Sequence, residues 1–431
     1  MTRPASHAGD DPLDRIQRAA FGYFLEHVNP LNGLVADTSR VAAPASIAVV
    51  GFALTCYPIG VERGWMSRTE AASLTLTTLE FFWASKQNRE PLATGYKGFF
   101  YHFLDMLTGQ RVWQSELSTI DTTLLLAGML VAGVYFDQDN ETETEIRILA
   151  EALYHRVDWL WVCKDAMPPR LGWKPNSGFL RHRWTGYDEA TLLYVLGLAS
   201  PTSPLPSDIY ATRTAGYHWK SVHGYDYLYA GQLFIHQFSH VWIDFDGIPD
   251  RFMHERGSDY FQNSRHAAYV QREYARQNPH EFAGYGDDFW ALTAGDGPGL
   301  LKRSIEGKRR RFFGYAARGA PFGPDDGTID PCAVIGSLPF APEISLSALQ
   351  HLLVRYPAIA SRARLPSGFN PTFPTKDSGG WMCEVDSGLD LGIVVTMIEN
   401  HRSGFIWRLM RNCPHVATGL RRAGFKGGWL S

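Results

Sequence analysis

The sequence predicts an all-α protein, an (α/α)6 barrel whose loop insertions form a cleft at one end. Helical hydrophobic patterns follow one another along most of the 431 residues, and no convincing run of alternating strands separates them. Some patterns are apolar on nearly every face and others are amphipathic, which is typical of an inner and an outer helical layer. About eleven patterns are present, close to the roughly twelve helices of such a barrel. An α-solenoid is the alternative, but the sequence shows no repeat of fixed period.

The first half of the chain contains the clearest helical patterns. Apolar residues recur at helical spacing from Leu13 onward. Ser67 and Glu70 have the spacing of a capping box, and so do Ser118 and Asp121, so helices are expected to begin at these two serines. The predicted helices of this half cover residues 13–27, 46–56, 67–85, 118–136, 141–161 and 188–198.

The second half of the chain is more interrupted. Loops rich in Gly, Pro, Asn and Asp separate its helical patterns, and a longer non-helical insertion is expected at 308–339. The basic run at 308–311 is interpreted as a solvated loop, and short strands are allowed for at 312–318 and near the histidine-rich segment. The predicted helices of this half cover residues 227–238, 260–277, 288–293, 345–356 and 388–400.

The composition changes nowhere sharply enough to mark a boundary between two domains. The prediction is therefore a flexible N-terminus at 1–11, one barrel domain at 12–412 and a C-terminal tail at 413–431. The oligomeric state is left open.

Charge, apolar runs and cysteines exclude several classes of protein. The net charge of −3 gives no basic footprint for nucleic acid. The longest apolar stretches are too short or too interrupted to cross a membrane. The first residues are polar and resemble no secretory signal, so a cytoplasmic protein is expected. The five cysteines are scattered without CxxC spacing, which supports neither a zinc ribbon nor a disulfide framework.

Aromatic residues are the main signal in the composition. The chain has 13 Trp, 19 Tyr and 25 Phe, together 13% of its residues. Aromatic rings suit carbohydrate sites, where sugar faces stack on them, but a large core uses the same residues. Composition leaves these two interpretations equal.

The segment at 234–246 concentrates two His and two Asp among aromatic residues. Because buried polar groups need partners, it is interpreted as the lining of a pocket. His236 and His240 stand four apart and would share one face of a helix. This spacing resembles a zinc motif, but Gln237 stands where that motif has its Glu. Sugar contacts explain these residues equally well, so neither a metal nor a cofactor is predicted.

Pairs of carboxylates stand at the starts of several predicted helices. Glu116 and Asp121 flank one start, and Glu189 follows Asp188 at another. Asp390 stands at the start of the helix at 388–400. Negative charge at a helix start has a structural explanation, because it meets the positive end of the helix dipole. Several acidic helix starts facing one cleft are also what glycoside hydrolysis requires: one acid, and one base or nucleophile. The sequence does not give their separation, so it does not choose between inversion and retention.

These motifs resemble the glucoamylase-like family that includes glycoside hydrolase family 144, the endo-β-1,2-glucanases. They also resemble the glucoamylase-like domain of cyclic β-1,2-glucan synthases. The resemblance extends over residues 12–410 in the expected order. The matching motifs are ASIA at 45–48 with GF at 51–52, ELSTIDT at 116–122, GYDEA at 186–190, QLFIHQFSH at 232–240 with Asp244, DYFQNSR at 259–265, GTIDP at 327–331, SLPFAP at 337–342, MIEN at 397–400 and RSG at 402–404.

The resemblance implies an (α/α)6 barrel that cleaves β-1,2-glucan, or its oligosaccharides, with inversion. It implies that Glu189 is the general acid and that Asp390 is on the base side, acting through a substrate hydroxyl and a water. Glu116 and Asp121 are then further acidic residues of the cleft. The expected substrate-binding residues are Trp184, Tyr187, His236, Gln237, His240 and Asp287.

The chain departs from the family pattern beside the expected base. Leu391 stands where a Gln is expected and Ile393 where a Pro is expected, and a changed loop could alter the water path or the linkage specificity. Many family members also carry a secretion or lipoprotein signal, and none is recognised here, which argues against a periplasmic role. An (α/α)6 barrel does not determine its chemistry, so the alternatives are transglycosylation, phosphorolysis or epimerisation on the same scaffold, or glucan binding without catalysis.

Overall fold

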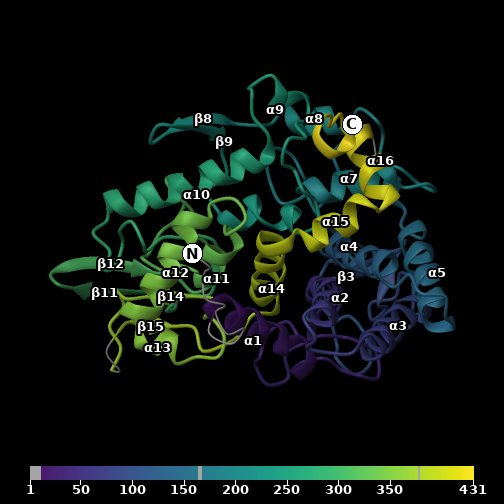
Figure 1. The fold of residues 1–431 in the computed structure, drawn as a ribbon, viewed down its shortest axis with the longest axis horizontal. Helices are drawn as coiled ribbons and strands as arrows, with labels where there is room; N and C mark the ends of the chain where they lie inside the picture. The colour runs from purple at the N-terminus through teal and green to yellow at the C-terminus, as the bar shows by residue number, and fades with distance from the viewer. Residues whose placement is uncertain (1–10, 164–166, 377–378) are drawn as a thin grey trace, which may run out of the picture.

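The protein is an (α/α)6 barrel, as predicted (Figure 1). The computed structural model describes residues 11–163, 167–376 and 379–431. The flexible N-terminus expected at 1–11 therefore lies almost wholly outside the described residues. Within the described ranges, no helix is long and apolar enough to cross a membrane.

The inner layer is built from helices that are buried on nearly every face. Helix α2 packs against α4 and α14, α4 packs against α7, and α11 packs against α14. Apolar residues all round these helices make this possible, since neighbours cover every face. The inner helices are α2 (Ile47–Glu62), α4 (Thr119–Tyr135), α7 (Thr191–Ala199), α11 (Pro331–Gly336) and α14 (Gly388–Ser403).

The outer layer covers the inner helices and includes both ends of the described chain. Helix α1 packs on α14, α5 on α4, α12 on α11 and α16 on α7. The segment expected as a C-terminal tail thus contains an outer helix, whose Val416 and Leu420 are buried. The outer helices are α1 (Pro12–Glu26), α3 (Arg68–Ala84), α5 (Glu141–His155), α10 (Tyr260–Gln277), α12 (Pro342–Arg355) and α16 (Pro414–Arg422).

Short 3-10 turns fill the remaining inner position, between α7 and α11. They are η2 (Leu233–His236) and η3 (Phe238–Val241), and α10 packs over η2. The helix predicted at 227–238 is therefore wrong. Its first residues belong to the hairpin of β8 (Trp219–Val222) and β9 (Tyr225–Leu228). The side chain of Asn263 binds both the N–H and the C=O of Leu228, which fixes this extended backbone.

The helix predicted at 288–293 is also wrong. Gln271 of α10 explains the difference, because its side chain donates to the carbonyls of Gly231 and Leu292 and accepts from the Leu292 N–H. These three bonds hold the backbone around Leu292 in a non-helical conformation beside the 3-10 turns. A buried side chain far away in the sequence thus overrides the local helical pattern.

Capping chemistry accounts for the helix starts that were predicted correctly. The Ser67–Glu70 capping box is formed in full, and the Ser118 hydroxyl accepts from the N–H of Asp121. Asp259 caps α10, which has the predicted boundaries. The helix predicted at 141–161 instead ends at His155, and α7 begins at Thr191, so Asp188 and Glu189 lie in the preceding turn.

Short antiparallel strands connect the helices. The largest sheet has the order β2 (Gly95–Tyr96), β3 (Phe99–Tyr101), β5 (Leu117–Ser118), β6 (Gly172–Lys174) and β7 (Gly178–Phe179). The basic run expected as a solvated loop lies in an exposed hairpin, β11 (Leu301–Ile305) with β12 (Lys308–Phe312). The insertion expected at 308–339 also contains α11. The remaining pairs are β1 (Ala45–Ser46) with β4 (Phe103–Leu104), β10 (Ala294–Gly295) with β13 (Ala316–Ala317), and β14 (Phe369–Asn370) with β15 (Trp381–Met382).

Several short helices complete the chain. They are α6 (Trp159–Val162), α8 (Ile209–Thr214), α9 (Arg251–His254), α13 (Pro357–Ala360), α15 (Phe405–Arg411) and the 3-10 turn η4 (Gly428–Leu430).

The close approach of α2 and α4 gives a prediction about stability. A Cβ atom at Gly128 would lie 2.1 Å from the Gly51 carbonyl oxygen, and one at Gly51 would lie 2.3 Å from that of Leu124. Because backbone atoms cannot rotate away, Gly128→Val is expected to lower the free energy of unfolding by about 3 kcal/mol. Thermal unfolding measures this. The control is Gly314→Ala, where the added Cβ meets open space. Equal unfolding temperatures for the two variants would contradict the prediction.

Candidate active site

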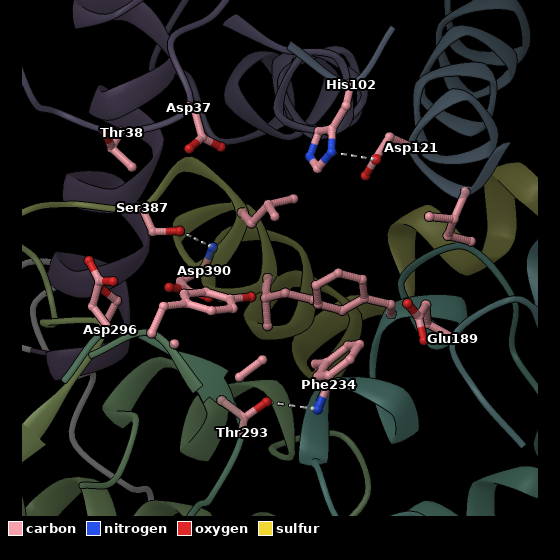
Figure 2. A pocket seen from close by; sticks show the side chains of 18 of the residues that line it. Asp37, Thr38, His102, Asp121, Glu189, Phe234, Thr293, Asp296, Ser387 and Asp390 are labelled. Carbon is pink, nitrogen blue, oxygen red and sulfur yellow. Dashed lines mark hydrogen bonds and ion pairs between the residues drawn. The ribbon is translucent and has the colours of Figure 1, made fainter. Parts of the chain in front are cut away.

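A cavity of about 660 Å³ opens where inner helices begin. Its lining includes Ser118 and Asp121 from the start of α4, Glu189 from the turn before α7, and Asp390 from the first turn of α14. Figure 2 shows Glu189 and Asp390 on opposite sides of this cavity, with His102 and Asp121 along a third side. The N-terminal ends of these helices therefore present their carboxyl groups to one space.

Glu189 is held by contacts to its backbone and to its neighbour. The hydroxyl of Ser239 donates to the Glu189 carbonyl at 2.9 Å and accepts from the N–H of Leu192 at 3.2 Å. Beside it, the fully buried guanidinium of Arg213 binds the Asp188 carboxylate at 2.8 Å. Burial raises the pKa of Glu189 to about 7, and the charges of Asp188 and Asp121 add to the effect. Glu189 is thus a carboxylic acid able to donate a proton near neutral pH.

Asp390, on the side of the cavity opposite Glu189, is a second carboxyl group with a raised pKa. Its backbone N–H donates to the Ser387 hydroxyl, which caps α14. Burial raises the pKa of Asp390 to about 7, although the Ser387 hydroxyl lowers it. The nearby charges of Asp37 and Asp296 raise it further. Asp390 therefore exchanges its proton in the same pH range as Glu189.

Asp330 is a further buried carboxyl group of the cavity lining. Its Oδ1 atom accepts from the N–H groups of Cys332 and Ala333 and so caps α11, whereas its Oδ2 atom is buried without a hydrogen-bond partner. Burial, followed by the charge of Asp390, raises the pKa of Asp330 well above its usual range. A protonated Asp330 can share its proton with a group in the cavity.

His102 also lines the cavity and was not found from the sequence. Its Nδ1 atom lies 3.0 Å from Glu116 Oε1 and 3.5 Å from Asp121 Oδ2. Burial disfavours the charged imidazole, but the carboxylates of Asp121, Glu116 and Asp37 outweigh it and raise the pKa of His102 to about 9. The hydrogen bond from His102 in turn lowers the pKa of Glu116. At neutral pH, this group is an imidazolium between carboxylates.

The same three side chains form a possible set of metal ligands. One possible metal-ligand atom from each of His102, Glu116 and Asp121 lies within 4.8 Å of the other two. A hard or borderline cation would compete with the proton of His102 for this position. Two histidines of the predicted pocket segment, His236 and His240, do not belong to this set.

A buried ion pair fixes the wall opposite His102. Arg318 binds Asp326 at 2.7 Å and also donates to the carbonyls of Gly295 and Gly314. It thereby ties the loop that carries Tyr315 to the loop that carries Asp296. Tyr315 is 74% exposed and lines the cavity.

The structure brings most of the predicted acidic residues together, but only some of the predicted substrate contacts. The predicted residues that line the cavity are Glu116, Asp121, Trp184, Glu189, Gln237 and Asp390. Asp287 lies elsewhere, half-exposed and paired with Arg272 at 2.9 Å. Tyr187 lies behind the lining, where its hydroxyl is 3.3 Å from His236 Nδ1. Two further acidic residues, Asp386 and Glu399, form ion pairs with arginines.

The interpretation of 234–246 as a pocket lining is correct only for Phe234, Gln237 and Phe238. His236 and His240 are buried behind them, and burial lowers their pKa to about 4 and about 3. The cause is the change from η2 to η3 between the two histidines, which breaks the helical face they would have shared. His240 instead contacts the Ser264 hydroxyl at 3.0 Å.

Residues from loops were missed because no periodic pattern marks them. Asp37, His102, Asp296 and Tyr315 all line the cavity and precede or follow short strands and bridges. A usable signal existed for Asp330, since it belongs to the GTIDP motif and precedes a proline at a helix start.

Comparisons with known proteins agree with the fold. A family model described as putative glucoamylase matches residues 181–414. A crystal structure of a putative glucoamylase from Bacteroides uniformis superposes with a TM-score of 0.87 at 27% identity, covering 99% of this chain and 100% of that one. The endo-β-1,2-glucanase from Chitinophaga pinensis, in complex with sophorotriose and glucose, has a TM-score of 0.83 at 25% identity, with coverage of 99% and 100%.

A curated relative is longer than this chain. It is the exo β-1,2-glucooligosaccharide sophorohydrolase (non-reducing end) of Parabacteroides distasonis, 26% identical over 448 residues. The alignment covers 95% of this chain but 57% of the relative, so the chain spans little more than half of that protein's length.

Fold and cavity together define an (α/α)6-barrel protein with an acidic cleft at one end of the barrel. The family match extends over more than half of the chain and includes Glu189, Asp330 and Asp390. The chain belongs to the glucoamylase-like family.

Proposed function

We propose that this protein is a glycoside hydrolase that cleaves β-1,2-glucan or its oligosaccharides with inversion. The observation that carries the proposal is the pair of carboxyl groups, Glu189 and Asp390, on opposite sides of one cavity, each with a pKa of about 7. Inverting hydrolysis needs one protonated and one ionised carboxyl group on opposite faces of the sugar. The substrate class is taken from the relatives named as a sophorohydrolase and an endo-β-1,2-glucanase.

Glu189 acts as the general acid in this mechanism. It is partly protonated at neutral pH because burial disfavours its charge, and it gives its proton to the glycosidic oxygen as the bond breaks. The contacts of Ser239 and Arg213 to the backbone and neighbour of Glu189 hold this acid in place. Fixed geometry matters because a misplaced acid loses most of its catalytic effect.

Asp390 acts on the base side. Water attacks the anomeric carbon from the face opposite the leaving group and releases a proton. This proton passes through a substrate hydroxyl and a water to Asp390, which accepts it in its ionised form. A pKa near 7 makes Asp390 a stronger base than an ordinary aspartate. The imidazolium of His102 keeps Glu116 ionised, so that this carboxylate can accept hydrogen bonds from sugar hydroxyls.

Incubation of the purified protein with linear β-1,2-glucan tests the substrate class, with laminarin and cello-oligosaccharides as controls. Short β-1,2-linked products from the first substrate alone are expected, and NMR of the fresh product should show the α-anomer. Longer products would indicate transglycosylation, and a requirement for phosphate would indicate phosphorolysis. An unchanged chain with an altered sugar would indicate epimerisation. Binding without turnover of any substrate would reject catalysis.

Substitution of the two carboxyl groups tests their roles. Glu189→Gln and Asp390→Asn keep the shape of each side chain but remove proton transfer, so each is expected to reduce kcat by about 10²- to 10⁴-fold. Steady-state hydrolysis of β-1,2-glucan measures this, with circular dichroism to confirm folding. Glu255→Gln, at an exposed residue whose carboxylate pairs with Arg251 outside the cavity, should retain full activity. Near-wild-type rates for either cavity variant would remove its assigned role.

The pH profile of kcat/KM provides an independent test. The active form has protonated Glu189 and ionised Asp390, so activity should follow a narrow bell centred near pH 7. Protonation of Asp390 gives the acid limb, and ionisation of Glu189 gives the alkaline limb. The charge of Asp37 raises the pKa of Asp390, so Asp37→Asn should move the acid limb to lower pH and leave the alkaline limb in place. A shift of both limbs together, or of the acid limb upward, would contradict this assignment.

A further inference from the structure

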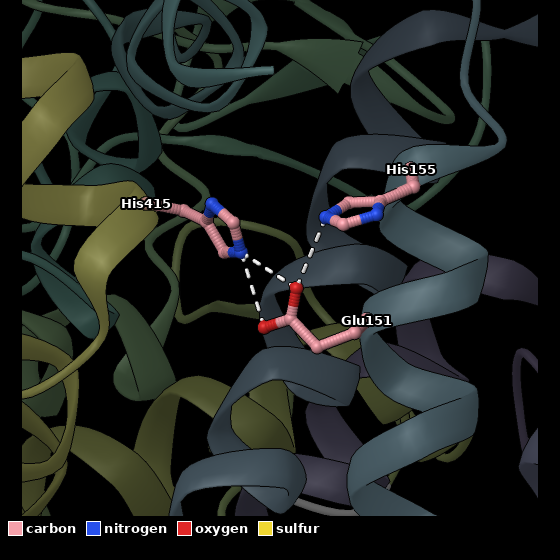
Figure 3. A group of neighbouring side chains, drawn as sticks. All are labelled: Glu151, His155 and His415. Atoms are coloured by element: carbon pink, nitrogen blue, oxygen red, sulfur yellow. Dashed lines mark hydrogen bonds and ion pairs between the residues drawn. The ribbon is translucent and has the colours of Figure 1, made fainter. Parts of the chain in front are cut away.

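Two histidines and one glutamate meet on the outer surface, on elements that do not line the cavity. Glu151 and His155 belong to the last turns of α5, and His415 is the second residue of α16. Figure 3 shows both imidazole rings directed at the carboxylate of Glu151. One donor atom from each of the three side chains lies within 4.8 Å of the other two.

The geometry of the two helices brings these groups together. Glu151 and His155 are four residues apart and therefore share one face of α5. His155 Nε2 lies 3.1 Å from Glu151 Oε2, and His415 Nε2 lies 2.9 Å from the same oxygen. Pro414 begins α16 and fixes the direction in which the chain enters this helix.

We propose that Glu151, His155 and His415 form a binding site for a divalent transition-metal ion of the zinc type, with water in the fourth position. Two imidazoles and one carboxylate are a ligand set that zinc accepts in tetrahedral geometry. Both histidines present Nε2 to the carboxylate of Glu151, so one ion can be bound by both rings and by this carboxylate. The site is separate from the proposed catalytic function and does not depend on it.

The two separations that involve Glu151 are close to those of an occupied site. Metal–ligand bonds of about 2.0–2.1 Å in a tetrahedron place neighbouring ligand atoms roughly 3.3 Å apart. The observed separations of 2.9 and 3.1 Å therefore need to widen by only a few tenths of an ångström. The side chains of Glu151 and His155 are 48% and 41% exposed, so they can make this adjustment and leave one position open to water.

His415 is the fixed member of the set. Its side chain is only 15% exposed, and its ring packs 4.3 Å, between centroids, from that of Tyr154. The Tyr154 hydroxyl donates to the Leu196 carbonyl at 2.7 Å, which anchors the tyrosine to α7. A side chain that is already oriented loses little conformational entropy when it binds a metal ion. The flexible side chains of an ordinary surface ion pair lose more.

A metal ion at this position would join α5 to α16, two outer helices from distant parts of the sequence. Because the ion binds the folded chain, its occupancy should stabilise the fold.

The test uses the full-length protein without a polyhistidine tag, stripped with a chelator. Titration with ZnCl₂ by calorimetry should show a saturable binding step of one ion per chain that depends on His155 and His415, and the unfolding temperature should rise by about 3 °C or more when this step is saturated. Titration with Co²⁺ should give the visible absorption bands of a tetrahedral nitrogen–oxygen site. This signature reports ligation directly, separately from stability.

Three variants complete the experiment. His155→Ala and His415→Ala should each lose the saturable zinc binding and the cobalt bands, and Glu151→Gln should lose them while keeping the shape of the side chain. The exposed His254, at the end of α9, provides the matched control, and His254→Ala should bind as the wild type does. Absence of saturable binding in the wild type, or binding that survives in both histidine variants, would overturn the proposal. Because these ligands lie outside the cavity, His155→Ala and His415→Ala should leave glucan cleavage unchanged.

Discussion

Burial of carboxyl groups at the beginnings of the inner helices is the constraint on which the cavity depends. The inner helices are apolar on nearly all faces, so the polar residues at their starts have no other surface to face. Removing several carboxyl groups from water together favours protonation and makes their charges repel. Raised pKa values follow for Glu189, Asp390 and Asp330. A carboxyl group with a raised folded-state pKa destabilises the fold once the pH exceeds its unfolded value, and this cost is fully present above the folded pKa. The packing around the cleft therefore offsets the unfavourable free energy of burying several carboxyl groups together.

Buried arginines provide part of that support. Arg213 neutralises Asp188 beneath the turn that carries Glu189, and Arg318 ties two loops of the opposite wall through Asp326. Each guanidinium is buried and binds both a carboxylate and at least one backbone carbonyl, so its charge is paired within the protein. The two sides of the cavity are therefore held by separate ion pairs. Loss of either arginine would leave a buried charge without a partner, which costs more than a surface ion pair contributes.

Local signals in the sequence were sufficient for the elements that depend on local chemistry. Ser67, Ser118 and Asp259 cap helices because their hydroxyl or carboxylate oxygens accept from nearby N–H groups, and these patterns are readable without a structure. The segments near Leu228 and Leu292 could not be predicted in this way, since Asn263 and Gln271 of a distant helix bind their backbones. For the same reason, Glu189 and Asp390 were found at helix starts, whereas His102 became visible only when the fold placed it between carboxylates from other segments.

The packing of α16 on α7 has a consequence for how the chain reaches its native state. A Cβ atom at Gly419 would lie 2.0 Å from the Val195 carbonyl oxygen, so the two helix backbones touch directly. During synthesis, α7 emerges long before α16, and its apolar surface has no permanent cover in the interval. Completion of the barrel therefore requires the contact between α7 and α16, two segments far apart in sequence. Such a long-range contact slows folding and leaves an apolar surface open to aggregation. We therefore expect α16 to dock late in folding, onto a core that has formed much earlier.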